Sequence, residues 1–161
     1  MANYIIRERV FSFGDDFTIQ DQDGHDVLYV DGKAFSLSDA MSVQDMAGNE
    51  LALIRRVLFS FGHSYSIERD GSTSVVSKEF FTFFSCHFTV DVPGPGDLEA
   101  AGSFLDHDYT FTDGAGQTVA VIHKHWLTLS DQYGVEIAEG QDDVLILCAA
   151  LVIDRICHEK K

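Results

Sequence analysis

The sequence predicts a mainly β domain, built as a sandwich or a barrel, that encloses a hydrophobic helix near its C-terminus. Three features support this fold class: Asp-x-x-Gly turn motifs recur between short apolar segments, residues 43–68 match residues 111–136 without a gap, and residues 144–153 are all apolar. The chain has 161 residues, 45% of them hydrophobic. This is enough for one buried core, and no shift in composition marks a second domain.

Four motifs of the form Asp-x-x-Gly begin at Asp21, Asp45, Asp113 and Asp131. Asp at the first position of a type I turn accepts hydrogen bonds from the turn's own backbone, and Gly at the fourth tolerates a positive φ. Each motif therefore predicts a β-hairpin. The segments between the turns are expected to be strands, at residues 17–19, 27–30, 51–58, 65–67, 88–92, 119–129 and 135–138.

A shift of 68 residues aligns residues 43–68 with residues 111–136, and seven of the 26 positions are identical. The identical pairs are Asp45/Asp113, Ala47/Ala115, Gly48/Gly116, Ala52/Ala120, Ile54/Ile122, Tyr65/Tyr133 and Glu68/Glu136. We expect one domain, residues 1–161, that contains two internal β repeats. Residues 93–96 hold both prolines and are expected to join the repeat halves. Two further turns are predicted, at Arg69-Asp70-Gly71 and at Val30-Asp31-Gly32.

The apolar run at residues 144–153 predicts a helix that is hydrophobic on all sides. Asp142 and Asp143 precede it and Arg155 follows it, which complements a helix dipole, although a strand buried on both faces remains an alternative. Ten helical residues span about 15 Å, whereas a bilayer core needs about 30 Å. No transmembrane segment is therefore predicted, and the better container is a closed sheet from the same chain. Removal of this segment is expected to unfold the domain.

Several segments together resemble the LURP-one-related family of the tubby C-terminal-like superfamily, which also includes the phospholipid scramblases. They are residues 17–24, 27–30, 31–33, the Asp45-x-x-Gly48 hairpin and residues 142–155, and the resemblance extends from about residue 4 to 157. It implies a roughly twelve-stranded antiparallel closed barrel around a central hydrophobic C-terminal helix.

The resemblance implies little about activity. Tubby domains bind phosphoinositide headgroups through basic residues, whereas the family that this chain resembles most has no established biochemical activity. Basic residues are few here, with Arg55-Arg56 the only adjacent pair before the terminal lysines, and no lipid pocket can be placed residue by residue. The terminal helix of scramblases has been proposed as a membrane span, but the apolar run here is too short for that role.

The formal net charge of −15 disfavours polyanionic partners such as nucleic acid and anionic headgroups. Cys86, Cys148 and Cys157 are odd in number and lack metal-site spacing, which indicates reduced thiols and a cytoplasmic setting. The first residues show no signal peptide.

His123-x-His125 would place two imidazoles on one face of a strand, a spacing that can hold Zn²⁺ or Cu²⁺ if a third ligand approaches. The aligned positions of the other repeat are Arg55-x-Val57, so a polar strand face is the simpler interpretation. Cys86-His87 is weaker still, because adjacent residues of a strand point to opposite faces.

Asp106-His107-Asp108 could hold a general-base histidine, but the sequence shows no nucleophile motif beside it. Asp21, Asp23 and Asp26 suggest calcium, but the spacing of an EF-hand loop is absent and turn chemistry explains these aspartates. Residues 80–84 contain four phenylalanines and are the first place to look for an apolar binding surface, although a strand or bulge buried on both sides is the simpler explanation.

The sequence therefore predicts a non-enzymatic domain that binds a lipid, an apolar small molecule or a protein partner. We assign no catalytic, cofactor-binding or metal-binding residue and expect the domain to fold without a cofactor. One alternative is a hydrolase or metal-dependent enzyme that uses His123 and His125 or Asp106 and His107. A second alternative is a membrane-associated protein of the scramblase type.

Overall fold

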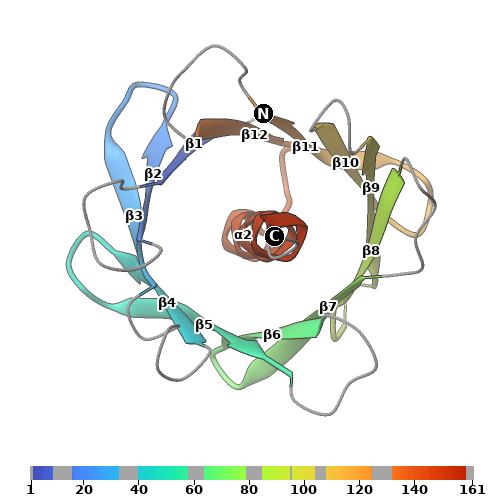
Figure 1. The fold of residues 1–161 in the computed structure, drawn as a ribbon, viewed down its shortest axis with the longest axis horizontal. Helices are drawn as coiled ribbons and strands as arrows, with labels where there is room; N and C mark the ends of the chain where they lie inside the picture. Colours follow the sequence, from blue (N-terminus) through green and yellow to red (C-terminus); the bar gives the residue numbers. More distant parts are fainter. Residues whose placement is uncertain are drawn as a thin grey trace.

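The computed structural model describes residues 2–8, 16–32, 40–57, 64–78, 85–94, 96–103, 108–124 and 132–158. Across these ranges the chain forms a closed antiparallel barrel of twelve strands with helix α2 at its centre (Figure 1). The predicted barrel is confirmed, and the sandwich alternative is excluded because β1 pairs with β12 and closes the sheet.

Every strand also pairs with its neighbour in the sequence. The strands are β1 (Ala2–Glu8), β2 (Phe17–Asp21), β3 (Asp26–Asp31), β4 (Ala40–Asp45), β5 (Glu50–Arg56), β6 (Ser64–Arg69), β7 (Ser72–Lys78), β8 (Ser85–Asp91), β9 (Leu98–Ser103), β10 (Asp108–Thr112), β11 (Thr118–Lys124) and β12 (Gln132–Ile137). Their inward side chains are apolar and buried, as at Tyr65 and Ile67 of β6, whereas Ser66 and Glu68 face outward.

Helix α2 (Asp143–His158) fills the barrel and confirms the prediction of a helix at the apolar run. All residues from Leu145 to Ile153 are at most 7% exposed. Inside a closed sheet the helix has no solvent face, which explains why its sequence is apolar on every side. Among the described residues, no helix combines the length and the apolar character that crossing a bilayer requires.

Three Asp-x-x-Gly turns close hairpins with the same hydrogen bonds. In the turn from Asp45, the amide of Gly48 donates to the Asp45 carbonyl over 3.1 Å, and Asp45 Oδ1 accepts from the amides of Ala47 and Asn49 over 3.0 and 2.9 Å. The turns from Asp21 and Asp113 repeat this pattern. The glycines have φ between 80° and 89°, as a β-bulge after the turn requires.

The fourth Asp-x-x-Gly motif was predicted wrongly as a turn. Asp131 lies outside the described residues, and Gly134 lies inside β12, where it pairs with Ile5 of β1 and with His123 of β11. The flanking side chains Tyr133 and Val135 point inward and are buried. Burial of this alternating pair therefore outweighs the local turn signal. The turn predicted at Asp70-Gly71 is confirmed, with φ values of 42° and 79° between β6 and β7.

Strand bounds also repeat along the chain. β11 begins and ends 68 residues after β5, and β12 begins and ends 68 residues after β6. The bulges of β4 and β10 fall at positions with the same offset. Equivalent positions in these strands can therefore be compared directly.

Candidate functional site

The end of the barrel at which α2 begins is formed by short acidic turns, and we call this end the mouth. It contains the turns β2–β3, β4–β5, β6–β7, β8–β9 and β10–β11 and the segment that leads into α2. These turns carry Asp23, Asp70, Asp97, Asp113, Glu139 and Asp142. Arg69 is the one lysine or arginine at the described part of this end, so the mouth is strongly negative.

Two polar contacts attach the start of α2 to the barrel wall. Asp142 pairs with Arg69 of β6, and its Oδ1 also accepts from the Leu145 amide over 3.3 Å as a helix cap. Tyr4 of β1 donates from its hydroxyl to Asp143 Oδ2 over 2.7 Å. Burial, followed by the hydrogen bond to Asp143 and the charges of Asp143 and Asp21, raises the pKa of Tyr4 to about 12.

Arg69 and Ser74 are polar residues at inward positions of the barrel. Arg69 follows Tyr65 and Ile67 on the inward face of β6, and Ser74 shares the inward face of β7 with Val76. Ser74 is 7% exposed. Arg69 Nε is buried, and none of the described residues is its hydrogen-bond partner.

These two side chains line a hollow of about 280 Å³ beside the start of α2, which we call the mouth pocket. Its lining is half apolar and half polar: Ile67, Val92, Pro93 and Leu145 on one hand, and Arg69, Asp70, Ser72, Ser74 and Asp142 on the other. The site thus offers hydroxyl and guanidinium donors, carboxylate acceptors and an apolar floor. The hollow therefore offers both polar and apolar contacts to a ligand.

A second hollow, of about 350 Å³, lies next to the first and shares Val92, Asp142 and Leu145 with it. We call it the acidic pocket, and its other lining residues are Gly96, Asp97, Leu98, Asp113, Gly114, Gly140, Gln141 and Ile146. Among the described residues, three carboxylates and no lysine or arginine line it. A phosphate or carboxylate ligand is therefore disfavoured here.

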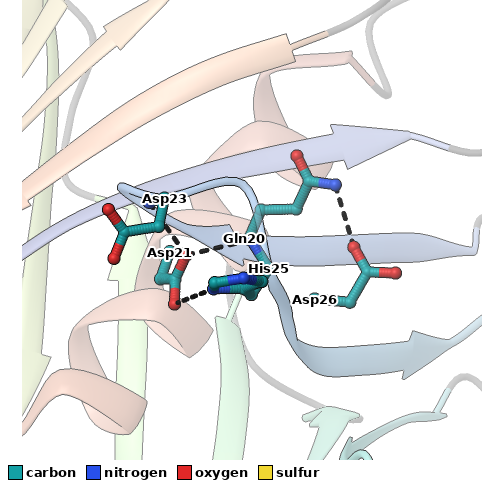
Figure 2. A network of polar contacts seen from close by, with 5 residues as sticks. All are labelled: Gln20, Asp21, Asp23, His25 and Asp26. Carbon is teal, nitrogen blue, oxygen red and sulfur yellow. Dashed lines mark hydrogen bonds and ion pairs between the residues drawn. The ribbon is translucent and has the colours of Figure 1, made fainter.

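The aspartates considered for calcium form a turn, shown in Figure 2. Asp21, Asp23 and His25 have potential ligand atoms within 4.8 Å of one another, but Asp26 is engaged with Gln20, whose amide donates to it over 2.8 Å. Asp21 Oδ1 already accepts from the backbone amides of Asp23 and His25. The His25 amide bond is the main reason that the pKa of Asp21 is lowered. Turn chemistry therefore accounts for this cluster.

His123 lies on the outer face of the barrel in an exposed cluster of charges. Its Nδ1 is 3.6 Å from Asp108 and its Nε2 is 3.8 Å from Glu136. The same positions 68 residues earlier hold Arg55 and Glu68, which pair over 3.3 Å. In both sites a basic side chain lies beside a carboxylate of a neighbouring strand, so this position does not require a metal. His125, Asp106 and His107 lie outside the described residues.

The other residues considered from the sequence do not form a site in the described parts of the chain. His87 faces outward, and its Nε2 lies 3.7 Å from Oε2 of Glu99. Cys148 is fully buried in α2, and this burial raises the pKa of its thiol to about 12, which disfavours the reactive thiolate. Residues 80–84 and the side chains of Cys86 and Cys157 lie outside the described residues.

The mouth pocket was not predicted from the sequence. One signal was available in β6, where the inward residues Tyr65 and Ile67 are followed by Arg69 at the strand end, which is a change from hydrophobic to charged side chains. Asp142 lies 73 residues from Arg69. No local pattern could have shown that the two side chains meet.

Comparison with known proteins gave three matches. A family profile described as LURP-one-related matches residues 2–154. Uncharacterized protein YxjI of Bacillus subtilis (strain 168) is 28% identical over 158 residues, which cover 98% of this chain and 95% of that protein. An X-ray structure of a protein from Arabidopsis thaliana superimposes with a TM-score of 0.71 at 19% identity, covering 96% of this chain and 91% of that one. At this identity the structural match supports the fold alone.

Proposed function

The chain belongs to the LURP-one-related family, and on that premise we propose that it is a non-enzymatic binding domain that recognises its ligand at the mouth of the barrel. One observation carries the proposal: two adjacent hollows of about 280 and 350 Å³ flank the start of α2. Their lining combines apolar, hydroxyl, cationic and carboxylate side chains, as expected of a recognition site.

The interior of the barrel supports the mouth as the place of binding. Side chains of α2 such as Leu147, Ala150 and Leu151 are at most 2% exposed, and the wall residues around them are equally buried. A long acyl chain would have to displace the helix from this packed core. A small molecule held at the mouth would not, so we favour a small molecule over a lipid or a protein partner.

The exposed histidine cluster supports binding over catalysis. Both ring nitrogens of His123 face carboxylates, from Asp108 and Glu136, and the His123 side chain is 45% exposed. General-base catalysis needs a reacting group within hydrogen-bond reach and a site that excludes water. The geometry around His123 provides neither among the described residues.

Native mass spectrometry of the purified protein tests the proposal. We expect a non-covalently bound small molecule that is lost in a Val92→Trp variant, because Val92 lines both hollows. Val75→Trp is the matched control, since Val75 lies at an outward position of β7. If the wild-type protein carries no bound mass and a thermal-shift screen of metabolites finds no ligand, the binding role would be contradicted.

Flotation with vesicles tests the scramblase-like alternative separately. We expect the protein to remain unbound with vesicles of neutral lipid and with vesicles that contain anionic lipid, because the mouth is negatively charged. Flotation with either vesicle would favour a membrane role, and flotation with anionic vesicles alone would point to basic residues away from the mouth.

A further inference from the structure

We propose that the mouth pocket binds a small amino-acid-like molecule, one that carries an amine and a carboxylate on a short apolar body. The inference deepens the proposed function and rests on it, since it names the ligand class of one of the two hollows. It is carried by the two polar side chains at inward positions of the pocket, Arg69 and Ser74, by the mixed charge of the pocket and by its size.

Ser74 is the first residue of the pocket that supports this ligand class. It is 7% exposed, lies at an inward position of β7 and lines the pocket. A hydroxyl at such a position needs a hydrogen-bond partner, because burial of a polar group without one costs free energy. The inward neighbour Val76 is fully buried and apolar, as the core requires. Ser74 is therefore placed to bind an acceptor group in the pocket.

Arg69 provides the second donor group. Its guanidinium lines the same pocket, its side chain is 28% exposed, and its ion pair with Asp142 leaves Nε without a partner within the described chain. Guanidinium and hydroxyl groups together match the oxygens of a carboxylate. The ion pair with Asp142 also holds the arginine at the mouth.

The acidic residues restrict the ligand further. Asp70 and Asp142 line the pocket with Arg69, so the three charges sum to one negative charge, and the whole protein carries −15. A simple anion would be repelled by this field, whereas a simple amine, which offers only donors when protonated, would leave Arg69 Nε unpaired. A molecule with both an amine and a carboxylate satisfies both sets of groups.

The apolar floor and the size of the pocket also fit a molecule of this class. Ile67, Val92, Pro93 and Leu145 provide apolar contact for a short side chain. The volume of about 280 Å³ corresponds to roughly nine water molecules at about 30 Å³ each. Such a space fits a molecule of amino-acid size.

Titration of the ¹⁵N-labelled protein with L-leucine, followed by amide NMR shifts, tests the inference. We expect saturable shifts centred on Arg69, Ser74 and Leu145. 4-Methylpentanoate is leucine without its amine and isoamylamine is leucine without its carboxylate, and we expect each to bind at least tenfold more weakly. Binding of either one as tightly as leucine would overturn the assignment of an amino-acid-like ligand.

Two variants at neighbouring positions of β7 distinguish binding in the pocket from binding at the outer wall. Ser74→Ala is expected to weaken leucine binding by about two- to tenfold, through loss of one hydrogen bond. Thr73→Ala is the matched control, because Thr73 is exposed at an outward position of the same strand, and it should bind as the wild type does. Equal affinities of both variants would contradict the role of Ser74.

The outcomes also separate this inference from the proposed function. If leucine causes no shifts but native mass spectrometry finds another molecule that Val92→Trp removes, the inference fails and the binding role stands. If neither experiment finds a ligand, both fail. Shifts spread over the outer wall instead of the mouth would also overturn the inference.

Discussion

The deep interior of the barrel and its mouth use the same inward positions of the same strands in different ways. In β6 the deep residues Tyr65 and Ile67 are fully buried and apolar, whereas Arg69 at the mouth is charged. In β7 the deep residue Val76 is apolar and Ser74 at the mouth carries a hydroxyl. This comparison indicates that hydrophobic side chains are required at inward positions only where α2 fills the barrel. The inward positions near the mouth are available for binding.

The largest loss of stability is expected from Leu151→Asp, a variant deep in the interior of the barrel. Leu151 is 1% exposed in the middle of α2, so the variant buries a carboxyl group with no partner. The cost is about 5 kcal/mol or more, comparable with the whole stability of a domain. We expect loss of a cooperative thermal transition by circular dichroism.

Leu151→Met is the control for this variant, because a swap of similar volume costs less than about 1.5 kcal/mol. A cooperative transition in Leu151→Asp at a melting temperature near that of the wild type would show that the centre of the helix is not tightly enclosed. The proposed difference between a packed interior and an open mouth would then be wrong.

A smaller loss of stability is expected from Gly102→Ala, at an inward position of β9. A Cβ at Gly102 would lie 2.2 Å from the Asp108 carbonyl oxygen and 2.5 Å from Cδ1 of Tyr109. Because a backbone atom must move, we expect a loss of about 1–3 kcal/mol in urea unfolding.

Ala101→Ser, at the exposed neighbouring position, is the control for Gly102→Ala and should change the stability by less than about 0.5 kcal/mol. If Gly102→Ala is as stable as the wild type, the close approach of Tyr109 to this strand is not a constraint on the interior.

At the mouth, Asp142→Ala removes both the helix cap and the partner of Arg69. Asp142 is 49% exposed, so the ion pair contributes little and the cap dominates. We expect a loss of about 0.5–2 kcal/mol in urea unfolding. Gln141→Ala, one residue earlier, should be near neutral, and a larger loss there than in Asp142→Ala would show that capping does not stabilise the start of α2.

The smallest effect is expected from Tyr4→Phe, and it depends on pH. The folded-state pKa of Tyr4 is about 12, above the unfolded value of 10.0, so its contribution is fully present below pH 10 and is lost as the pH rises through about 12. At pH 8 the variant should be less stable by about 1 kcal/mol. Thermal unfolding at pH 8, 10 and 11.5 should show this difference shrinking, and a difference that stays constant would contradict the role of the Asp143 contact.

The turns show how far local sequence reasoning extends. Asp45-x-x-Gly48 is a turn because its carboxylate and its glycine satisfy the chain within five residues, and the sequence contains everything that this structure needs. Asp131-x-x-Gly134 has the same pattern, yet Gly134 belongs to a strand paired on both sides. The pairing partners lie far away in the sequence, so local signals could not reveal them.

From the sequence alone, the turns at Asp21, Asp45, Asp70 and Asp113, seven of the strands and the enclosed helix could be predicted, because turn bonds, side-chain parity and apolar content depend on residues that are close along the chain. Only the tertiary structure decided where the candidate site lies. Arg69, Ser74 and Leu145 come from β6, β7 and α2 and share a pocket only after the barrel closes around the helix. Closure also decides which inward positions face packed side chains and which face the open mouth, since that depends on where α2 begins within the barrel.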